Sequence, residues 1–162
     1  MRNAWSLITM VFFITVASAH AINAPPEARK FDEFGDVGCE DEKARLDNFA
    51  NELQNNPDAQ GYIIFYGGKR RQSADRRHSR LEFPRQGEAA ARVARLKPYM
   101  SMRGIDNERV LVINGGYRDL WAVELWIVPK GANPPTPTPT VKPQEIRFRR
   151  GKIKKREYEC DV

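Results

Sequence analysis

The sequence predicts an α+β domain in which two helices pack on one face of a mixed sheet. Apolar side chains recur at helical spacing in two segments, and short runs of β-branched and aromatic residues alternate with these segments. Glycine pairs and prolines separate the elements. In chain order they are a weak strand, a helix, a strand, a second helix and two strands, an order that builds a β-α-β-α-β-β sandwich.

The first predicted strand covers residues 30–34, and a helix follows from Glu40. Acids fill the first turn of this helix, where the helix dipole favours negative charge. Its apolar residues fall at positions i, i+3, i+4 and i+7: Leu46, Phe49, Ala50 and Leu53. The next strand covers residues 61–66, and the pair Gly67-Gly68 is expected to end it.

Residues 69–85 show no periodicity and predict a long basic loop. A second helix is expected over residues 86–103, with an apolar side formed by Ala89, Ala90, Val93, Leu96 and Met100. Pro98 lies inside this helix and lacks a backbone N–H, so the sequence predicts a kink or an early end there.

Two further strands are expected over residues 109–114 and 121–128, with Gly115-Gly116 as the turn region between them. Side chains alternate between the two faces of a strand. We therefore expect one face of the last strand to carry Trp121, Val123, Leu125 and Ile127, and the other to carry Ala122, Glu124, Trp126 and Val128.

The first 21 residues have the layout of a cleavable secretory signal peptide, with a cation, an apolar run and small residues in that order. Ala19-His20-Ala21 supplies the A-x-A pattern, so cleavage is expected after Ala21, with Ala19 as the alternative. An uncleaved anchor is disfavoured because the apolar run is too short to cross about 30 Å of hydrocarbon. The sequence therefore predicts a periplasmic or secreted protein without a transmembrane segment after cleavage.

The mature chain divides into three predicted parts. Residues 22–130 form the α+β domain, residues 131–142 a stiff linker rich in proline and threonine, and residues 143–162 a basic tail in which Arg150-Gly151 is compatible with a hairpin turn. Charge is unevenly spread, since residues 22–60 carry four cations against ten acids and residues 69–85 carry seven cations against two acids. This asymmetry favours anionic partners on one side of the molecule.

Residues 46–128 resemble the OmpA-like family of peptidoglycan-associated domains. The resemblance rests on the first helix with Asn56-Pro57 after it, and then on three pairs that follow in order: Tyr99-Met100, Gly104-Ile105 and Arg109-Val110. It implies the OmpA-like fold and a non-enzymatic role in the cell envelope. Peptidoglycan or another anionic wall polymer would be the partner.

The same resemblance implies a ligand site. In the family, an Asp at the end of a strand and an Arg in the second helix hold diaminopimelate of the peptidoglycan stem peptide. The Arg falls on Arg92, whereas the Asp falls on Gly68, so Gly68→Asp is expected to strengthen weak binding. Arg92 otherwise pairs with Glu88 on its own helix. The loop cations Arg70, Arg71, Arg76 and Arg77 are further candidate ligand-binding residues for anionic polymers.

The residue inventory argues against an enzyme. His78 is the one histidine left after cleavage, and neither a Ser/His/Asp set nor a metal-binding pattern of His and Cys is present, so no cofactor is expected. Phe83 is the one aromatic residue in the basic loop, which disfavours nucleic acid. The alternative function is an interaction protein that keeps the scaffold, has lost diaminopimelate binding and contacts another exported protein through its tail.

Two cysteines, Cys39 and Cys160, are expected to form a disulfide in an oxidising compartment. The alternative is a pair of free thiols.

Overall fold

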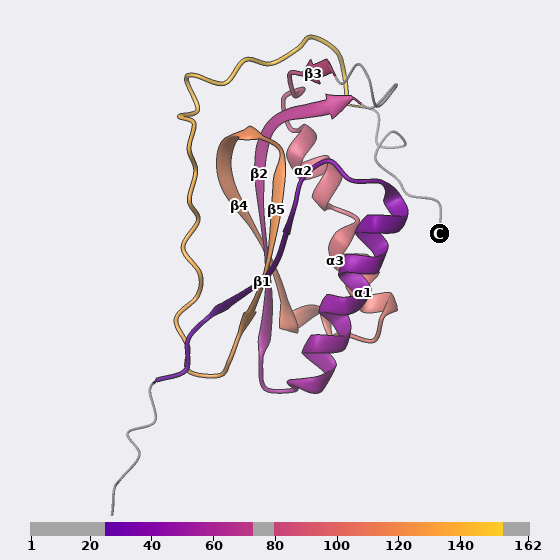
Figure 1. Ribbon diagram of the computed structural model, residues 1–162, viewed down its shortest axis with the longest axis vertical. Coiled ribbons are helices and arrows are strands. Elements are labelled where there is room, and N and C mark those ends of the chain that lie inside the picture. Colours follow the sequence, from indigo (N-terminus) through magenta and orange to yellow (C-terminus); the bar gives the residue numbers. More distant parts are fainter. Residues whose placement is uncertain (1–24, 73–79, 154–162) are drawn as a thin grey trace, which may run out of the picture.

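The computed structural model describes residues 25–72 and 80–153 and has the predicted α+β architecture, with helices on one face of a mixed sheet (Figure 1). The predicted signal peptide lies outside the described residues. Among the described residues, no helix has the length and apolar character needed to cross a bilayer. The elements are β1 (Arg29–Phe34), α1 (Cys39–Asn55), β2 (Gln60–Gln72), β3 (Arg80–Glu82), α2 (Glu88–Val93), α3 (Leu96–Met102), the 3₁₀ turn η1 (Asn107–Arg109), β4 (Val110–Leu120) and β5 (Ala122–Val128).

Strand β2 is the centre of the sheet. Its first part, residues 60–66, pairs antiparallel with β5, while residues 61–69 pair parallel with β4 along the opposite edge. β1 extends the sheet by pairing antiparallel with β5. Although β4 and β5 are consecutive in the chain, they are therefore separated in the sheet by β2.

The connection from β4 to β5 crosses β2 at Gly68. The backbone N–H of Trp121 donates to the carbonyl of Lys69 at 2.9 Å. A Cβ atom on Gly68 would lie 2.3 Å from the carbonyl carbon of Leu120. The expectation that Gly67-Gly68 ends the strand is wrong: the glycines let another backbone approach, and β2 continues through them.

The expectation of a loop over residues 69–85 is also wrong in part. β2 runs on to Gln72, and residues 70–72 pair antiparallel with β3. Gly115-Gly116 likewise lies inside β4, where Gly116 has a φ of 90° and the pairing with β2 changes register nearby. Long-range pairing supplies the backbone hydrogen bonds of these segments, and the local sequence carries no sign of it.

The second predicted helix is interrupted. α2 ends at Val93 and α3 begins at Leu96, which makes Pro98 the third residue of α3. In the first turn of a helix, a backbone N–H has no partner within the helix, so proline costs little there. The expected break is present and lies a few residues before Pro98.

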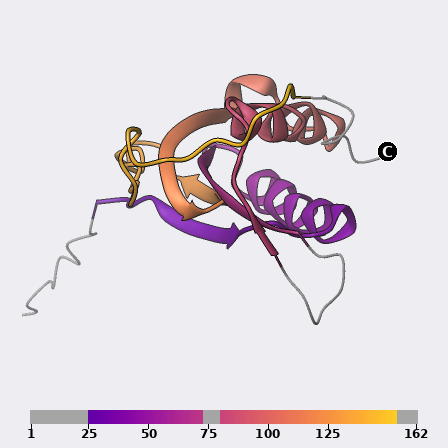
Figure 2. The ribbon, with the colours of Figure 1, turned by 90° about the horizontal axis from the view of Figure 1, so that it is seen from above.

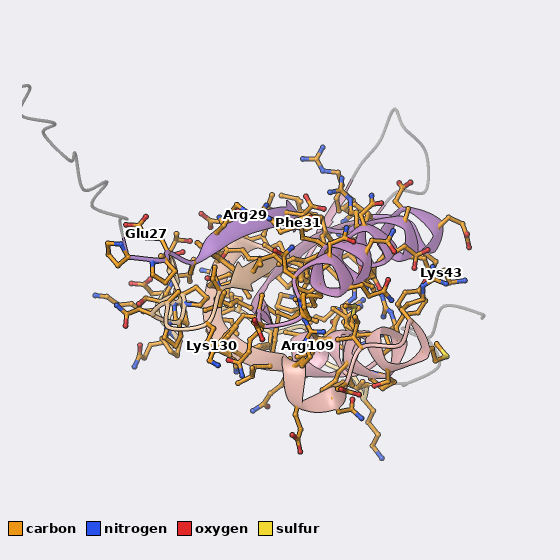
Figure 3. The ribbon with its side chains drawn as sticks, turned by 90° about the horizontal axis from the view of Figure 1, so that it is seen from below. Glu27, Arg29, Phe31, Lys43, Arg109 and Lys130 are labelled. Carbon is orange, nitrogen blue, oxygen red and sulfur yellow. The ribbon has the colours of Figure 1, made fainter. Side chains whose placement is uncertain are left out.

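The core lies between the sheet and the helices. Trp121, Val123, Leu125 and Ile127 of the last strand pack there with the apolar face of α1, whereas Ala122 and Trp126 lie on the opposite face. The predicted alternation along this strand is confirmed. At the far end of the core, Arg109, labelled in Figure 3, donates to the carbonyls of Leu53, Asn56 and Ala59 and joins the end of α1 to the start of β4.

The helix-free face of the sheet is covered by residues 133–141, which we call the proline segment (Figures 1 and 2). Thr138 donates its backbone N–H to the Tyr66 hydroxyl at 3.0 Å and receives a hydrogen bond from Arg118 at 2.7 Å. Val141 forms an antiparallel bridge with Tyr117, and Pro135 is buried. The proline segment therefore contacts the domain at Pro135 and over residues 138–141.

A buried carboxylate lies under the proline segment. Glu124 is 2% exposed and accepts hydrogen bonds from Lys30, Arg118, Tyr66 and Trp126 at 2.7–3.2 Å. Burial by itself raises the pKa of Glu124, but the hydrogen bonds from Lys30, Arg118 and Trp126 outweigh burial and lower the pKa to about 2. Glu124 thus joins β5 to β1, β2 and β4 as a charged group.

Replacing Gly68 by Ala should lower the free energy of unfolding by at least ~2 kcal/mol, because the new methyl group meets the Leu120 backbone, which the hydrogen bond from Trp121 to Lys69 holds against β2. Urea unfolding followed by circular dichroism measures this. Gly38→Ala is the matched control, since nothing lies within 4 Å of a Cβ at Gly38. Equal stabilities of the two variants would contradict the crossing at Gly68.

Protonation of Glu124 should lower the free energy of unfolding at acid pH. Its pKa falls from 4.5 in the unfolded chain to about 2 in the folded protein, so its ionised form stabilises the fold above pH 4.5. This contribution, on the order of 3 kcal/mol, is lost as pH falls from 4.5 through 2.

Urea titrations between pH 7 and pH 2 should show a smaller pH dependence in Glu124→Gln than in the native chain. Glu108→Gln, a change at an exposed position, is the control and should follow the native curve. Parallel curves for the native chain and Glu124→Gln would refute the prediction that ionised Glu124 stabilises the fold.

Candidate functional site

The candidate site lies where α2 faces the loop between β1 and α1. Arg92, in the last turn of α2, donates from Nη2 to Oδ1 of Asp36 at 2.6 Å. The side chains of Arg92 and Asp36 are 13% and 16% exposed. Both charges are therefore close to the surface and largely withdrawn from water.

Four charges alternate in sign across this site. Arg70 of β2 lies between two acids, with Nη1 3.1 Å from Glu88 Oε1 and Nε 3.7 Å from Asp36 Oδ2. Glu88 also accepts from the backbone N–H of Arg85 at 2.7 Å. Arg92 and Glu88 are four residues apart on one helix, yet each pairs with a partner from another element.

The indole ring of Trp121 packs against the guanidinium of Arg92. The guanidinium carbon of Arg92 lies 5.1 Å from the centroid of the Trp121 ring, in the geometry of a cation–π contact. Burial lowers the pKa of Arg92, and the Asp36 carboxylate opposes this effect. Arginine still remains a cation at neutral pH, so a planar, oriented guanidinium is held in place.

Asp36 has spare acceptor capacity. It accepts one side-chain hydrogen bond within the described residues, from Arg92, and its contact with Arg70 is too long for another. A carboxylate has about four acceptor positions. The site can therefore offer an acceptor for a cation beside a donor for an anion.

The structure places only some of the residues predicted from the family resemblance in this site. Arg92 and Arg70 meet in this site, whereas Gly68 lies at the chain crossing and has no room for any side chain. Gly68→Asp would place its Cβ against backbone, so the expectation that it restores an acid is wrong. Arg71 is exposed, and Arg76 and Arg77 lie outside the described residues.

Asp36, Glu88 and Trp121 were not among the predicted site residues. The acids of residues 32–42 suggested a helix start and a charged surface, and the sequence contains one signal that separates Asp36 from them. Asp36 lies in the stretch Gly35-Asp36-Val37-Gly38, directly after a strand, where loops commonly carry binding residues.

The C-terminal segment borders the site, and Figure 2 shows it passing from the sheet side toward α2. Arg149 contacts Glu82 at 3.0 Å and Glu88 at 3.9 Å, and its backbone N–H donates to the carbonyl of Pro84. No strand forms between residues 143 and 153, so the hairpin expected there is not present in the described part of the tail.

The side-chain contacts of the site are ion pairs between arginines and carboxylates, and this arrangement suits the binding of a charged ligand. Within residues 25–72 and 80–153, no group of three His, Cys, Asp or Glu side chains has an arrangement that could hold a metal ion. The paired acid and guanidinium match a ligand with an ammonium beside a carboxylate, because each ligand charge finds its opposite.

No family model and no curated protein matches this chain. Among solved structures, the crystal structure of the periplasmic domain of Helicobacter pylori MotB is similar at 13% sequence identity and a TM-score of 0.41. The match covers 59% of this chain and 67% of that chain. Membership of the OmpA-like family therefore stays a prediction, and the proposals below rest on the residues of this chain.

Cys39 is the first residue of α1, three positions after Asp36, and Cys160 lies outside the described residues. The disulfide between them stays a prediction, and intact mass of the exported protein after alkylation without reductant tests it. We expect no alkylated thiol. Such a bond contributes roughly 4 to 5 kcal/mol in the chain-entropy model, so a reductant should lower the melting temperature. Two alkylated thiols would contradict the prediction.

Proposed function

We propose that this chain is an exported, non-enzymatic binding module of the cell envelope. It takes a zwitterionic group of peptidoglycan, such as diaminopimelate of the stem peptide, between Asp36 and Arg92. The observation that carries the proposal is the 2.6 Å pair itself: an acid from the β1–α1 loop lies where it can complete the half-site formed by Arg92. The acid missing at Gly68 is thus replaced by one from another part of the chain.

Ligand exchange at this pair keeps the charges balanced. A ligand carboxylate takes the place of Asp36 on the Arg92 guanidinium, and the ligand ammonium takes the place of Arg92 on Asp36. No unpaired charge is then buried, which avoids the largest cost of opening a buried ion pair. Arg70 stays paired with Glu88 during the exchange, so its charge adds little repulsion toward the ammonium.

A comparison with Glu124 supports the exchange at Asp36. Glu124 is 2% exposed and accepts from four side chains, so it has no free position for a ligand. Asp36 is more exposed and accepts from one side chain within the described residues. Of these two acids, Asp36 is the one that can receive an ammonium.

A second candidate function has its own supporting observation. Because Asp36 already accepts a hydrogen bond from Nη2 of Arg92 at 2.6 Å, the pair can also act as a permanent internal contact. The chain would then be an interaction protein on the same scaffold, without diaminopimelate binding.

Calorimetric titration of diaminopimelate into the native chain, Arg92→Ala and Asp36→Asn separates the two functions. We expect the native chain to bind and each variant to lose about tenfold to a hundredfold in affinity, since each loses one charged hydrogen bond to the ligand. Arg45→Ala is the matched control, because Arg45 also makes a part-buried ion pair, with Asp32 at 2.6 Å, and contacts neither Asp36 nor Arg92 within the described residues.

Thermal unfolding confirms in parallel that each variant is folded, and sedimentation with purified sacculi repeats the comparison on the polymer. Absence of native binding in both assays would refute the proposed function and support the second candidate. Native binding that persists in Arg92→Ala would show that the ligand lies elsewhere.

A further inference from the structure

β2 and β3 form a two-stranded ribbon that lies at one end of the long axis of the molecule (Figure 1). Arg71 pairs with Leu81 in the antiparallel register, and the ammonium of Lys69 lies 5.6 Å from the centroid of the Phe83 ring. Because side chains alternate along a strand, these four residues share one face. Leu120, which pairs with Lys69, adjoins them. We call these five residues the ribbon face.

The inner face of the ribbon carries ion pairs, whereas the ribbon face carries exposed apolar side chains. On the inner face, Arg70 pairs with Glu88, and Glu82 pairs with Arg149 at 3.0 Å. On the ribbon face, Leu81, Phe83 and Leu120 are 47%, 40% and 45% exposed. Large apolar side chains are therefore presented to solvent together, on a surface of their own.

The cations around these apolar side chains are available to a partner. Within the described residues, Arg71 is exposed, and neither Arg71 nor Lys69 makes an ion pair; Lys69 lies over the Phe83 ring. A shallow pocket of about 230 Å³ borders Lys69 and Phe83, and its charged lining residues Asp119, Glu145 and Arg147 bring two acids and one further cation. Three cations, Lys69, Arg71 and Arg147, thus lie beside two acids around the ribbon face.

We propose that the ribbon face docks on an anionic lipid surface. The apolar side chains insert among the acyl chains near the headgroups, and the cations remain at the level of the lipid phosphates. A hydrophilic wall glycan has no apolar phase to receive Leu81, Phe83 and Leu120, whereas a bilayer interface offers both environments. The ribbon face does not include Asp36 or Arg92, so the proposal stands apart from the wall-binding function.

Sedimentation of the full chain with lipid vesicles tests this proposal. We expect binding to phosphatidylcholine vesicles that contain phosphatidylglycerol, weakening with added salt, and no binding to phosphatidylcholine alone. Replacing both Lys69 and Arg71 by Ser should weaken binding about 25-fold, at about fivefold for each cation. Replacing both Leu81 and Phe83 by Ser should weaken it at least ~10-fold, because the inserted apolar groups are lost.

Met102→Ser is the matched control, since Met102 is 60% exposed and lies on α3, away from the ribbon face. It should bind vesicles like the native chain. Phe83→Trp keeps an aromatic ring at the face, and its emission should shift to the blue when anionic vesicles are added. This readout does not depend on a variant that loses apolar side chains.

Three results would overturn the proposal. The first is no binding of the native chain to anionic vesicles. The second is equal binding by the native chain and the variant in which Ser replaces Leu81 and Phe83. The third is loss of sacculus binding in the ribbon variants without any vesicle binding, which would assign the ribbon face to the wall polymer.

Discussion

The chain crosses its own central strand at Gly68, and much of the molecule depends on this close approach. The crossing places β4 and β5 on opposite edges of β2, where a simple hairpin would have made them neighbours. It also places the Trp121 ring in contact with the guanidinium of Arg92. Beyond the crossing, β2 is free to pair with β3, which forms the ribbon. A side chain at Gly68 would interfere with all three arrangements.

Charge is buried in two different ways on the two faces of the sheet. On the helix-free face, Glu124 is surrounded by four donors, and this saturation explains its low pKa. Beside α2, the charges of Arg92, Asp36, Arg70 and Glu88 alternate along a row, and each acid there makes fewer close contacts with cations. Saturated groups hold elements together, whereas unsaturated ones near the surface can exchange partners. The physical contrast between these two clusters is the basis for assigning binding to one of them.

Residues 133–149 give the sandwich a partial third layer. The proline segment packs over Tyr66 and Gly116 by short contacts, among them Thr138 to the Tyr66 hydroxyl. Gly116 can adopt its positive φ and lets Pro139 approach because it has no side chain. Farther on, Phe148 meets Tyr117 edge to face and Arg149 reaches the acids of the β3–α2 region. Residues predicted as a linker therefore lie against the helix-free face of the sheet, and part of the basic tail reaches the β3–α2 region.

The sequence by itself determined the fold class, the first helix and the two faces of β5, because periodic burial leaves a direct record in the order of apolar residues. It also pointed to Arg92 and Arg70. Only the tertiary structure decided the role of Gly68, since a glycine that ends a strand and one that admits a crossing chain look alike in sequence. The same holds for Asp36, which lies 56 positions from Arg92 in the chain and meets it only because β1 and α2 converge on one end of β2. Periodicity records which face of an element is buried, whereas ion pairs and backbone crossings between distant segments are decided by how the elements are assembled.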